Sequence, residues 1–229
     1  MTLEELQAGK VLSIDKPLEW TSFQVVNKMR WMIRKHFGIK KIKIGHAGTL
    51  DPLATGLLII CVGKATKTIA KYQGQEKEYT GTLVLGATTP SYDLETEIDQ
   101  RYSLDGLTEA AIRKAATSLN GEIIQKPPIF SAIKKDGKRL YEHARAGRSV
   151  EVEGRRVMIY SFELTRIEHP EVDFRVVCSK GTYIRSLAHD LGQALDNGAH
   201  LSRLRRVRIG EHLVSDAWDL DTFARKLQA

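Results

Sequence analysis

The sequence predicts a mixed α+β fold, in which helices pack on a largely antiparallel central sheet. Strand-like segments and amphipathic helices are interspersed along the 229 residues without a repeating strand–helix unit, and this argues against a regular parallel α/β fold. The composition is 42% hydrophobic, as expected for a globular protein with a buried core. Internal repeats and low-complexity linkers are absent from the sequence. We therefore expect a single domain over residues 1–229.

The first elements follow from periodicity and capping residues. Residues 11–15 read as a short strand that ends at Lys16-Pro17. Thr21 or Ser22 can cap the helix that follows, and apolar residues recur along it with helical spacing. This predicted stripe consists of Val25, Val26, Met29 and Ile33. A loop rich in Gly, Thr and Pro follows at residues 45–56 and leads into an apolar strand.

The later elements alternate between strands and helices. Thr108 and Thr182 can each cap a helix, and Asp216 is predicted to open a terminal one. The first of these helices is expected to turn Ala111, Ile112, Ala115 and Leu119 inward, and the second Ile184, Leu187, Leu191 and Leu195. Further strands are predicted at residues 57–62, 79–86, 150–166, 172–178 and 201–209. Residues 88–97 read as a polar, turn-rich loop.

The charge of the chain favours a polyanionic partner. Its net charge is +7, which fits nucleic acid, an anionic membrane or an acidic protein. The run from Arg30 to Lys43 contains six Lys or Arg and no acid, and residues 126–148 form a second basic segment. A run as one-sided as 30–43 favours phosphate contacts over a merely solvated face.

Several classes of site and location are not indicated. Cys61 and Cys178 lie in apolar surroundings and read as buried free thiols. The Cys and His spacing matches no metal site, and the chain lacks P-loop, G-x-S-x-G and dinucleotide motifs. No apolar run approaches a membrane span, and the N-terminus does not read as a secretory signal. These features predict a cytoplasmic protein without a metal or nucleotide cofactor.

Asp51 is the acidic residue that stands out. Three glycines and a proline surround it in the loop 45–56, and they imply a backbone of unusual shape. A carboxylate held in such a loop could act as a nucleophile or general base. An aspartate before a proline is also common in turns and helix caps, so the residues alone leave both interpretations open.

Arg185 is a candidate partner for that carboxylate. If Thr182 caps a helix, Arg185 falls in the first turn, where a cation opposes the helix dipole. A buried carboxylate would offset this cost and would itself stay ionised. The pattern therefore allows an Asp51–Arg185 pair, with a solvated surface arginine as the alternative.

Several ordered motifs resemble one known family. Residues 45–58 match every fixed position of the Gly-His-x-Gly-x-Leu-Asp-Pro-x-Ala-x-Gly-x-Leu motif of the TruB family, the bacterial tRNA pseudouridine-55 synthases. Residues 178–185 match its Cys-Ser-Lys-Gly-Thr-Tyr-Ile-Arg motif. Further similar segments stand at residues 15–22, 77–79, 128–147 and 199–206. The resemblance covers residues 11–210.

The resemblance implies a pseudouridine synthase fold with a thumb-like RNA-gripping insert at residues 126–148. It implies isomerisation of uridine 55 in the T loop of tRNA by base flipping, without a cofactor. Asp51 would be the nucleophile, Arg185 its partner, and Tyr79 the residue that stacks on the uracil and takes part in proton transfer at C5. The implied substrate-binding residues are His46, Tyr79, Tyr183 and Leu204. The candidate RNA backbone contacts are Lys134, Lys135, Lys138, Arg139, Arg205 and Arg206.

The sequence departs from the family pattern in three places. Glu19 stands where a glycine is usual, and loop 88–97 lacks the first acid of Thr-Asp-Thr-x-Asp, although Asp93 can fill the second acidic place. The segment after Gly210 is too short for the C-terminal RNA-binding PUA domain that many relatives carry. We therefore expect a short form, acting as a monomer on the T arm of tRNA and not at a membrane.

Two other functions remain open. A non-catalytic RNA-binding protein could keep the basic segments without needing Asp51, Tyr79 and Arg185. A synthase of a sister family could act on ribosomal or small nuclear RNA instead of tRNA. The intact set of candidate catalytic residues argues against the first alternative, and the match at residues 178–185 argues against the second.

Overall fold

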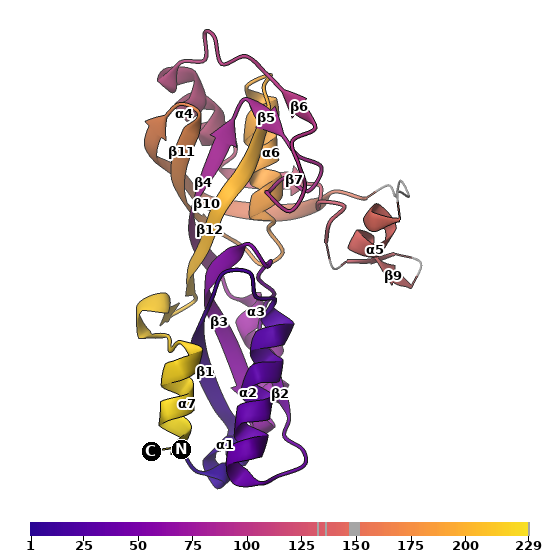
Figure 1. Ribbon diagram of the computed structural model, residues 1–229. Coiled ribbons are helices and arrows are strands. Elements are labelled where there is room, and N and C mark those ends of the chain that lie inside the picture. The colour runs from indigo at the N-terminus through magenta and orange to yellow at the C-terminus, as the bar shows by residue number, and fades with distance from the viewer. Residues whose placement is uncertain (132, 136, 147–151, 229) are drawn as a thin grey trace. The chain divides into compact units, whose positions relative to one another are not determined.

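The computed structural model describes residues 1–131, 133–135, 137–146 and 152–228 (Figure 1). Its contacts divide the chain into two compact units, Met1–Tyr79 with Leu204–Ala229, and Thr80–Arg203. Strands β4 (Lys77–Leu85) and β12 (Ala199–Ile209) contribute residues to both units. Each unit packs helices on a sheet, and this confirms the predicted mixed α+β class.

The sheet of the first unit is built around β3 (Ala54–Val62). Strands β1 (Lys10–Lys16) and β2 (Ile44–His46) both pair with β3 in antiparallel fashion. Strand β12 pairs with β3 in parallel, with Leu204 opposite Ala54 and Arg206 opposite Gly56. A short strand, β13 (His212–Leu213), closes an antiparallel hairpin with β12.

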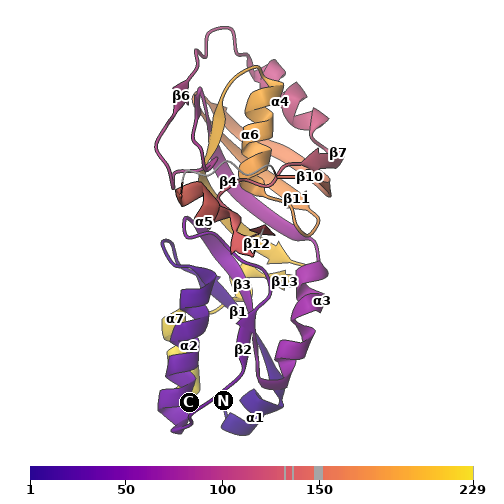
Figure 2. The same cartoon turned by 90° about the vertical axis from the view of Figure 1, so that its right-hand side faces the viewer.

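Strand β3 is apolar from Leu57 to Val62, where both of its faces are covered. One face contributes Leu58, Ile60 and Val62 to a core with α1 (Leu3–Gly9), α2 (Ser22–Phe37) and α7 (Leu220–Gln228). The other face packs against the 3-10 helix η1 (Gly63–Thr68) and α3 (Ile69–Gly74). Figure 2 shows α2 and α3 on opposite sides of this sheet. The residues at alternate positions therefore belong to two different cores.

The helix ends of this unit partly follow the prediction. Thr21 caps α2 by accepting a hydrogen bond from the Gln24 backbone N–H, and the predicted apolar stripe is buried. The terminal helix does not open at Asp216. Val214–Asp216 forms a 3-10 turn, η2, and the extended residue Ala217 interrupts the helical conformation. Asp219 instead accepts a 2.6 Å hydrogen bond from the Thr222 backbone N–H at the start of α7.

The second unit has the strand order β12-β4-β11-β10-β7. Strand β10 (Arg155–Glu168) pairs in antiparallel fashion with β11 (Glu171–Cys178) and β7 (Gly121–Gln125). Helices α4 (Glu109–Ser118) and α6 (Ile184–Ala194) contact each other, and α4 also contacts β10. The α4 stripe differs from the prediction, because Ala111 is exposed and Ala116 is buried instead.

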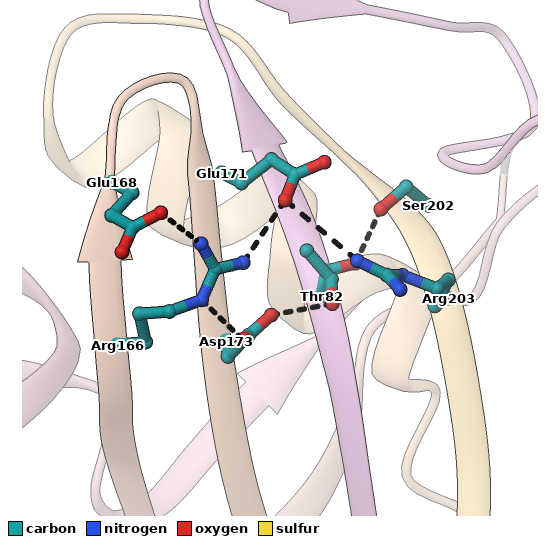
Figure 3. A network of polar contacts seen from close by, with 7 residues as sticks. All are labelled: Thr82, Arg166, Glu168, Glu171, Asp173, Ser202 and Arg203. Carbon is teal, nitrogen blue, oxygen red and sulfur yellow. Dashed lines mark hydrogen bonds and ion pairs between the residues drawn. The ribbon is translucent and has the colours of Figure 1, made fainter.

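Polar residues of β11 alternate with its buried positions and take part in a network of polar contacts (Figure 3). Arg166 bonds three carboxylates, with nitrogen–oxygen distances of 2.6 Å to Asp173, 2.6 Å to Glu168 and 3.0 Å to Glu171. Thr82 donates a 2.6 Å hydrogen bond to Asp173. The charge of Arg166 is therefore neutralised inside the unit.

Short elements complete the description. They are β5 (Ala87–Thr88), β6 (Gln100–Arg101), β8 (Lys134–Lys135), β9 (Lys138–Arg139) and α5 (Leu140–Arg145). Cys61 and Cys178 are buried free thiols, as predicted. Among the described residues, none of the helices is long and apolar enough to cross a membrane.

Candidate active site

The loop that carries Asp51 connects β2 to β3 and is held in place by the first residue of α2. The hydroxyl of Ser22 accepts a 2.8 Å hydrogen bond from the Leu50 backbone N–H and donates one of 3.1 Å to the Leu50 carbonyl. Ser22 is almost fully buried. The backbone N–H of Ala54 donates to the Asp51 carbonyl at 3.1 Å. Both contacts fix the backbone on either side of Asp51, whose side chain is partly exposed.

Arg206 supports the same loop from β12. Its side chain is 1% exposed, and its guanidinium donates to the carbonyls of Leu57 at 2.7 Å, Gly48 at 3.1 Å and Thr49 at 3.5 Å. This corrects the predicted phosphate contact, because the guanidinium is buried and directed to main-chain carbonyls. A buried arginine whose N–H groups donate to main-chain carbonyls does not reach an RNA phosphate.

Lys16 is a third support, and it lies in the segment 15–22 that resembles the family motif but received no predicted role. It is fully buried at the end of β1, and its ammonium donates to the carbonyls of Pro17 at 2.9 Å, Pro52 at 3.4 Å and Trp20. Burial lowers the pKa of Lys16 to about 8, and the Asp51 carboxylate opposes that shift. The signal in the sequence was its position, since Leu12, Ile14 and Lys16 share one face of the strand.

We predict that Asp51→Asn lowers the pKa of Lys16 below about 8, because the substitution removes the negative charge that favours the ammonium form. The unfolded chain binds this proton more readily than the folded one. The contribution of Lys16 to the free energy of unfolding is therefore lowest below about pH 8. It rises as the pH increases from about 8 toward 10.5, the ordinary pKa of a lysine.

The measurement is a titration of the Lys16 side chain by ¹³C nuclear magnetic resonance in the original protein, in Asp51→Asn and in Asp221→Asn. Asp221 lies in the first turn of α7 and serves as the control. An unchanged or higher Lys16 pKa in Asp51→Asn would show that the two groups are not coupled.

Two backbone positions explain the shape of this region. Gly56 has a φ of +103°, and a Cβ there would lie 2.3 Å from the Arg206 carbonyl oxygen. Glu19, the residue that replaces the usual glycine, has a φ of +64°, and its backbone N–H donates to the Pro52 carbonyl at 2.9 Å. The left-handed conformation accounts for glycine in the family pattern, and the sequence tolerates Glu there at some cost in strain.

The other predicted residues of the first unit lie on three strands. His46 ends β2 and is partly buried, and burial, assisted by the charge of Arg206, lowers its pKa. Leu204 lies beside the end of the loop, because its carbonyl accepts a 3.5 Å hydrogen bond from Thr55. Tyr79 is buried on β4, with 8% of its surface exposed. The structure therefore assembles Asp51, His46 and Leu204 around one loop.

Arg185 and Tyr183 belong to the second unit. Helix α6 begins at Ile184 with Tyr183 as its N-cap, so the predicted cap at Thr182 is wrong. The Thr182 hydroxyl instead donates to the Ser179 carbonyl at 3.0 Å. The Tyr183 backbone N–H donates to the Gln125 side chain at 2.7 Å. Arg185 still lies in the first helical turn, as expected.

Within this unit the carboxylate next to Arg185 is that of Asp93. The Arg185 Nε lies 3.6 Å from Asp93 Oδ2, and both side chains are buried. The guanidinium also donates to the carbonyls of Ser91 at 3.2 Å and Phe130 at 2.9 Å. The divergent loop 88–97 thus supplies an acid to Arg185. Asp51 lies in the other unit, and the Asp51–Arg185 pair stays a prediction.

A stacked pair of rings anchors the same loop one helical turn further along α6. Tyr92 stacks on His189 with ring centres 4.1 Å apart and planes 13° from parallel. The backbone N–H of Leu201 donates to the Tyr92 carbonyl at 2.9 Å. The sequence did not reveal this pair, because the family pattern leaves the position of Tyr92 variable, His189 lies outside the motifs, and 97 residues separate the two.

We predict that Asp93→Asn destabilises the protein by about 3 kcal/mol, because it leaves the buried charge of Arg185 without this carboxylate. Urea unfolding followed by circular dichroism measures the change. Glu97→Gln, an exposed position in the same loop, is the matched control and should change the free energy of unfolding by less than about 0.5 kcal/mol. Equal stabilities of the two variants would contradict the assigned pair.

The remaining candidate RNA contacts have mixed outcomes. Arg205 is partly exposed and bonds Asp15, with a nitrogen–oxygen distance of 2.6 Å. The other four candidates, Lys134, Lys135, Lys138 and Arg139, form the hairpin of β8 and β9. The structure describes the backbone of this hairpin but not these four side chains. Residues 132, 136, 147 and 148 of the predicted thumb-like insert also lie outside the described residues. These contacts stay predictions.

Comparison with known proteins decides the family. The sequence-family model described as TruB family pseudouridylate synthase (N terminal domain) matches residues 34–184. A second family model, described as tRNA pseudouridylate synthase B C-terminal domain, matches residues 185–228. The chain belongs to the TruB family. Relatives named tRNA pseudouridine synthase B are 62% identical over 229 residues in Flavobacterium johnsoniae and 54% identical over 215 residues in Phocaeicola vulgatus. The alignments cover 100% and 94% of this chain, and 100% and 92% of the relatives.

Solved structures place the TruB chain in the same fold group. A chain in the crystal structure of a Cbf5-Nop10-Gar1 complex superposes with a TM-score of 0.70 at 32% identity, covering 97% of this chain and 55% of that one. A chain from an archaeal box H/ACA sRNP Nop10-Cbf5 complex gives 0.68 at 28% identity, covering 100% and 57%. This TruB chain therefore spans about half the length of those proteins, and their likeness supports the predicted pseudouridine synthase fold.

Proposed function

We propose that this protein isomerises uridine 55 in the T loop of tRNA to pseudouridine, with Asp51 as the catalytic nucleophile. The observation that carries the proposal is the Asp51 loop, which matches the family motif and is held by Ser22, Lys16 and Arg206. Relatives that match nearly the whole chain bear the name tRNA pseudouridine synthase B. A loop supported in this way keeps a carboxylate in a fixed position, as nucleophilic catalysis requires.

The reaction needs access to a base that is normally stacked. The target nucleotide flips out of the RNA at a cost of a few kcal/mol, and stacking on an aromatic side chain offsets roughly 1–3 kcal/mol of it. In this proposal Tyr79 provides the stack, Tyr183 and Leu204 line the uracil pocket, and His46 fills the gap left in the RNA.

The bond changes are redox-neutral. The bond from N1 to the sugar breaks, the uracil rotates, and C5 bonds to the sugar. C5 loses its proton and N1 gains one, so the product has the same atoms as the substrate. Asp51 acts either at uracil C6 or at the sugar, and Arg185 pairs with its carboxylate. The proposed chemistry uses protein groups alone, and Tyr79 takes part in proton removal at C5.

The proposal extends to the organisation of the protein. Residues 1–229 would act as one catalytic domain, monomeric and cytoplasmic. The thumb-like insert and Arg205 would hold the T arm through phosphates, which position the RNA without reading its sequence.

Tritium release from uridine C5 tests the proposed function. The purified protein is incubated in EDTA with unmodified tRNA that carries ³H at C5, and carbodiimide-blocked primer extension maps the product. We expect release from a single T-loop uridine. Release only from ribosomal or small nuclear RNA would indicate a sister synthase, and binding to tRNA without release from any RNA would indicate a binding protein.

A further inference from the structure

The net positive charge of the chain resides in one segment of the first unit. Residues 20–50 contain seven Lys or Arg and no acid, so the rest of the chain holds 28 basic and 28 acidic residues. The net charge of +7 is therefore the charge of this segment. Its basic residues are Lys28, Arg30, Arg34, Lys35, Lys40, Lys41 and Lys43.

These basic side chains differ from Arg166 and Arg208. Arg166 and Arg208 each bond two or more carboxylates, as Figure 3 shows for Arg166. Within the described part of the chain, none of the seven basic side chains of residues 20–50 forms an ion pair with an acid. All but Arg30 are exposed. Their charge is thus available to an external anion.

An exposed tryptophan lies among these charges on α2. Lys28, Trp31 and Lys35 are spaced by three and four residues and therefore share one face of the helix. Trp31 is 53% exposed, and the ammonium groups of Lys28 and Lys35 lie 5.0 Å and 4.9 Å from its ring centre. We call these three residues the α2 face.

We propose that the α2 face binds tRNA, with Lys28 and Lys35 on backbone phosphates and Trp31 stacked on a base. This inference rests on the proposed function, which makes tRNA the substrate. Phosphate binding releases counterions and uses unpaired lysines directly, and a base can stack on an exposed indole flanked by cations. The cores of protein–protein interfaces are depleted in lysine, so a protein partner fits this surface less well.

The position of the α2 face separates it from the target nucleotide. Ser22, the first residue of α2, holds Leu50 beside Asp51. Trp31 and Lys35 lie nine and thirteen residues further along the helix, or about 14 Å and 20 Å at 1.5 Å per residue. Adjacent nucleotides of an RNA strand lie much closer to each other than these distances of about 14–20 Å. In this proposal the α2 face therefore contacts RNA outside the flipped nucleotide, and it adds affinity without taking part in the chemistry.

The test measures the dissociation constant of unmodified full-length tRNA as a function of salt for Lys28→Gln/Lys35→Gln and for Trp31→Ala. We expect the double variant to bind about tenfold more weakly, with a log Kd against log salt slope reduced by about 1.4–1.8 for two lost phosphate contacts. Trp31→Ala should also lose about tenfold in affinity but should keep the salt slope. Trp31→Phe should retain most of the binding.

The matched control is Lys114→Gln/Lys226→Gln, which removes the same charge from exposed lysines on α4 and α7. In the α2 variants we expect KM to rise with the dissociation constant while kcat at saturating tRNA is unchanged. Equal effects of the control pair, unchanged tRNA affinity, or a fall in kcat with unchanged affinity would each overturn the proposal. Tritium release by the original protein is measured separately, so a failure of the proposed function is distinguished from a failure of this surface.

Discussion

Asp51→Asn is expected to reduce tritium release from the T-loop uridine by at least about 10⁴-fold, as removal of a nucleophile does in other enzymes. The amide has nearly the same size and keeps the loop contacts made by the backbone, but it cannot form the covalent bond. The affinity for tRNA should change little, because the basic contacts are intact. Single-turnover tritium release and filter binding measure the two quantities on the same preparation.

Two further variants separate chemistry from structure at this position. Asp51→Glu keeps the charge and moves the carboxylate by about one methylene, a displacement that can cost about 100-fold in rate. Asp221→Asn, on the first turn of α7, should leave release unchanged. Release by Asp51→Asn within tenfold of the original protein would contradict the assignment of Asp51 as nucleophile.

Gly56→Ala should cause the largest loss of stability, about 3 kcal/mol or more. The new Cβ would lie 2.3 Å from the carbonyl oxygen and 2.8 Å from the nitrogen of Arg206. The backbone also holds a φ of +103°, which an alanine adopts only with strain. Relief requires β3 and β12 to separate where they pair, and overpacking of this kind is itself costly. The Asp51 loop and Leu204 would be displaced together.

Gly74→Ala is the matched control. Gly74 ends α3, and a Cβ there meets nothing within 4 Å, so alanine should be neutral or stabilising by up to about 1 kcal/mol. Urea unfolding and tritium release are measured for both variants. If Gly56→Ala proved as stable as Gly74→Ala, the close approach of β3 and β12 would be wrong.

Local patterns predicted most elements but not all of their ends. The α2 stripe and its Thr21 cap were correct because capping and helical burial depend on neighbouring residues. The predicted caps at Thr182 and Asp216 failed for a related reason. Both residues are good caps locally, but the Thr182 hydroxyl bonds Ser179 and the extended Ala217 interrupts the terminal helix. Competing local contacts decided these boundaries.

The sequence by itself determined the mixed fold class, the family, and Asp51 as the candidate nucleophile, because these rest on contiguous patterns of residues. Only the tertiary structure showed that Arg206 is a buried support of the loop, that Lys16 donates to the Pro52 carbonyl in it, and that Asp93 accompanies Arg185. The physical reason is that burial and pairing depend on strands and loops far apart in the chain. A charged residue reads the same in sequence whether it faces solvent or donates to buried carbonyls.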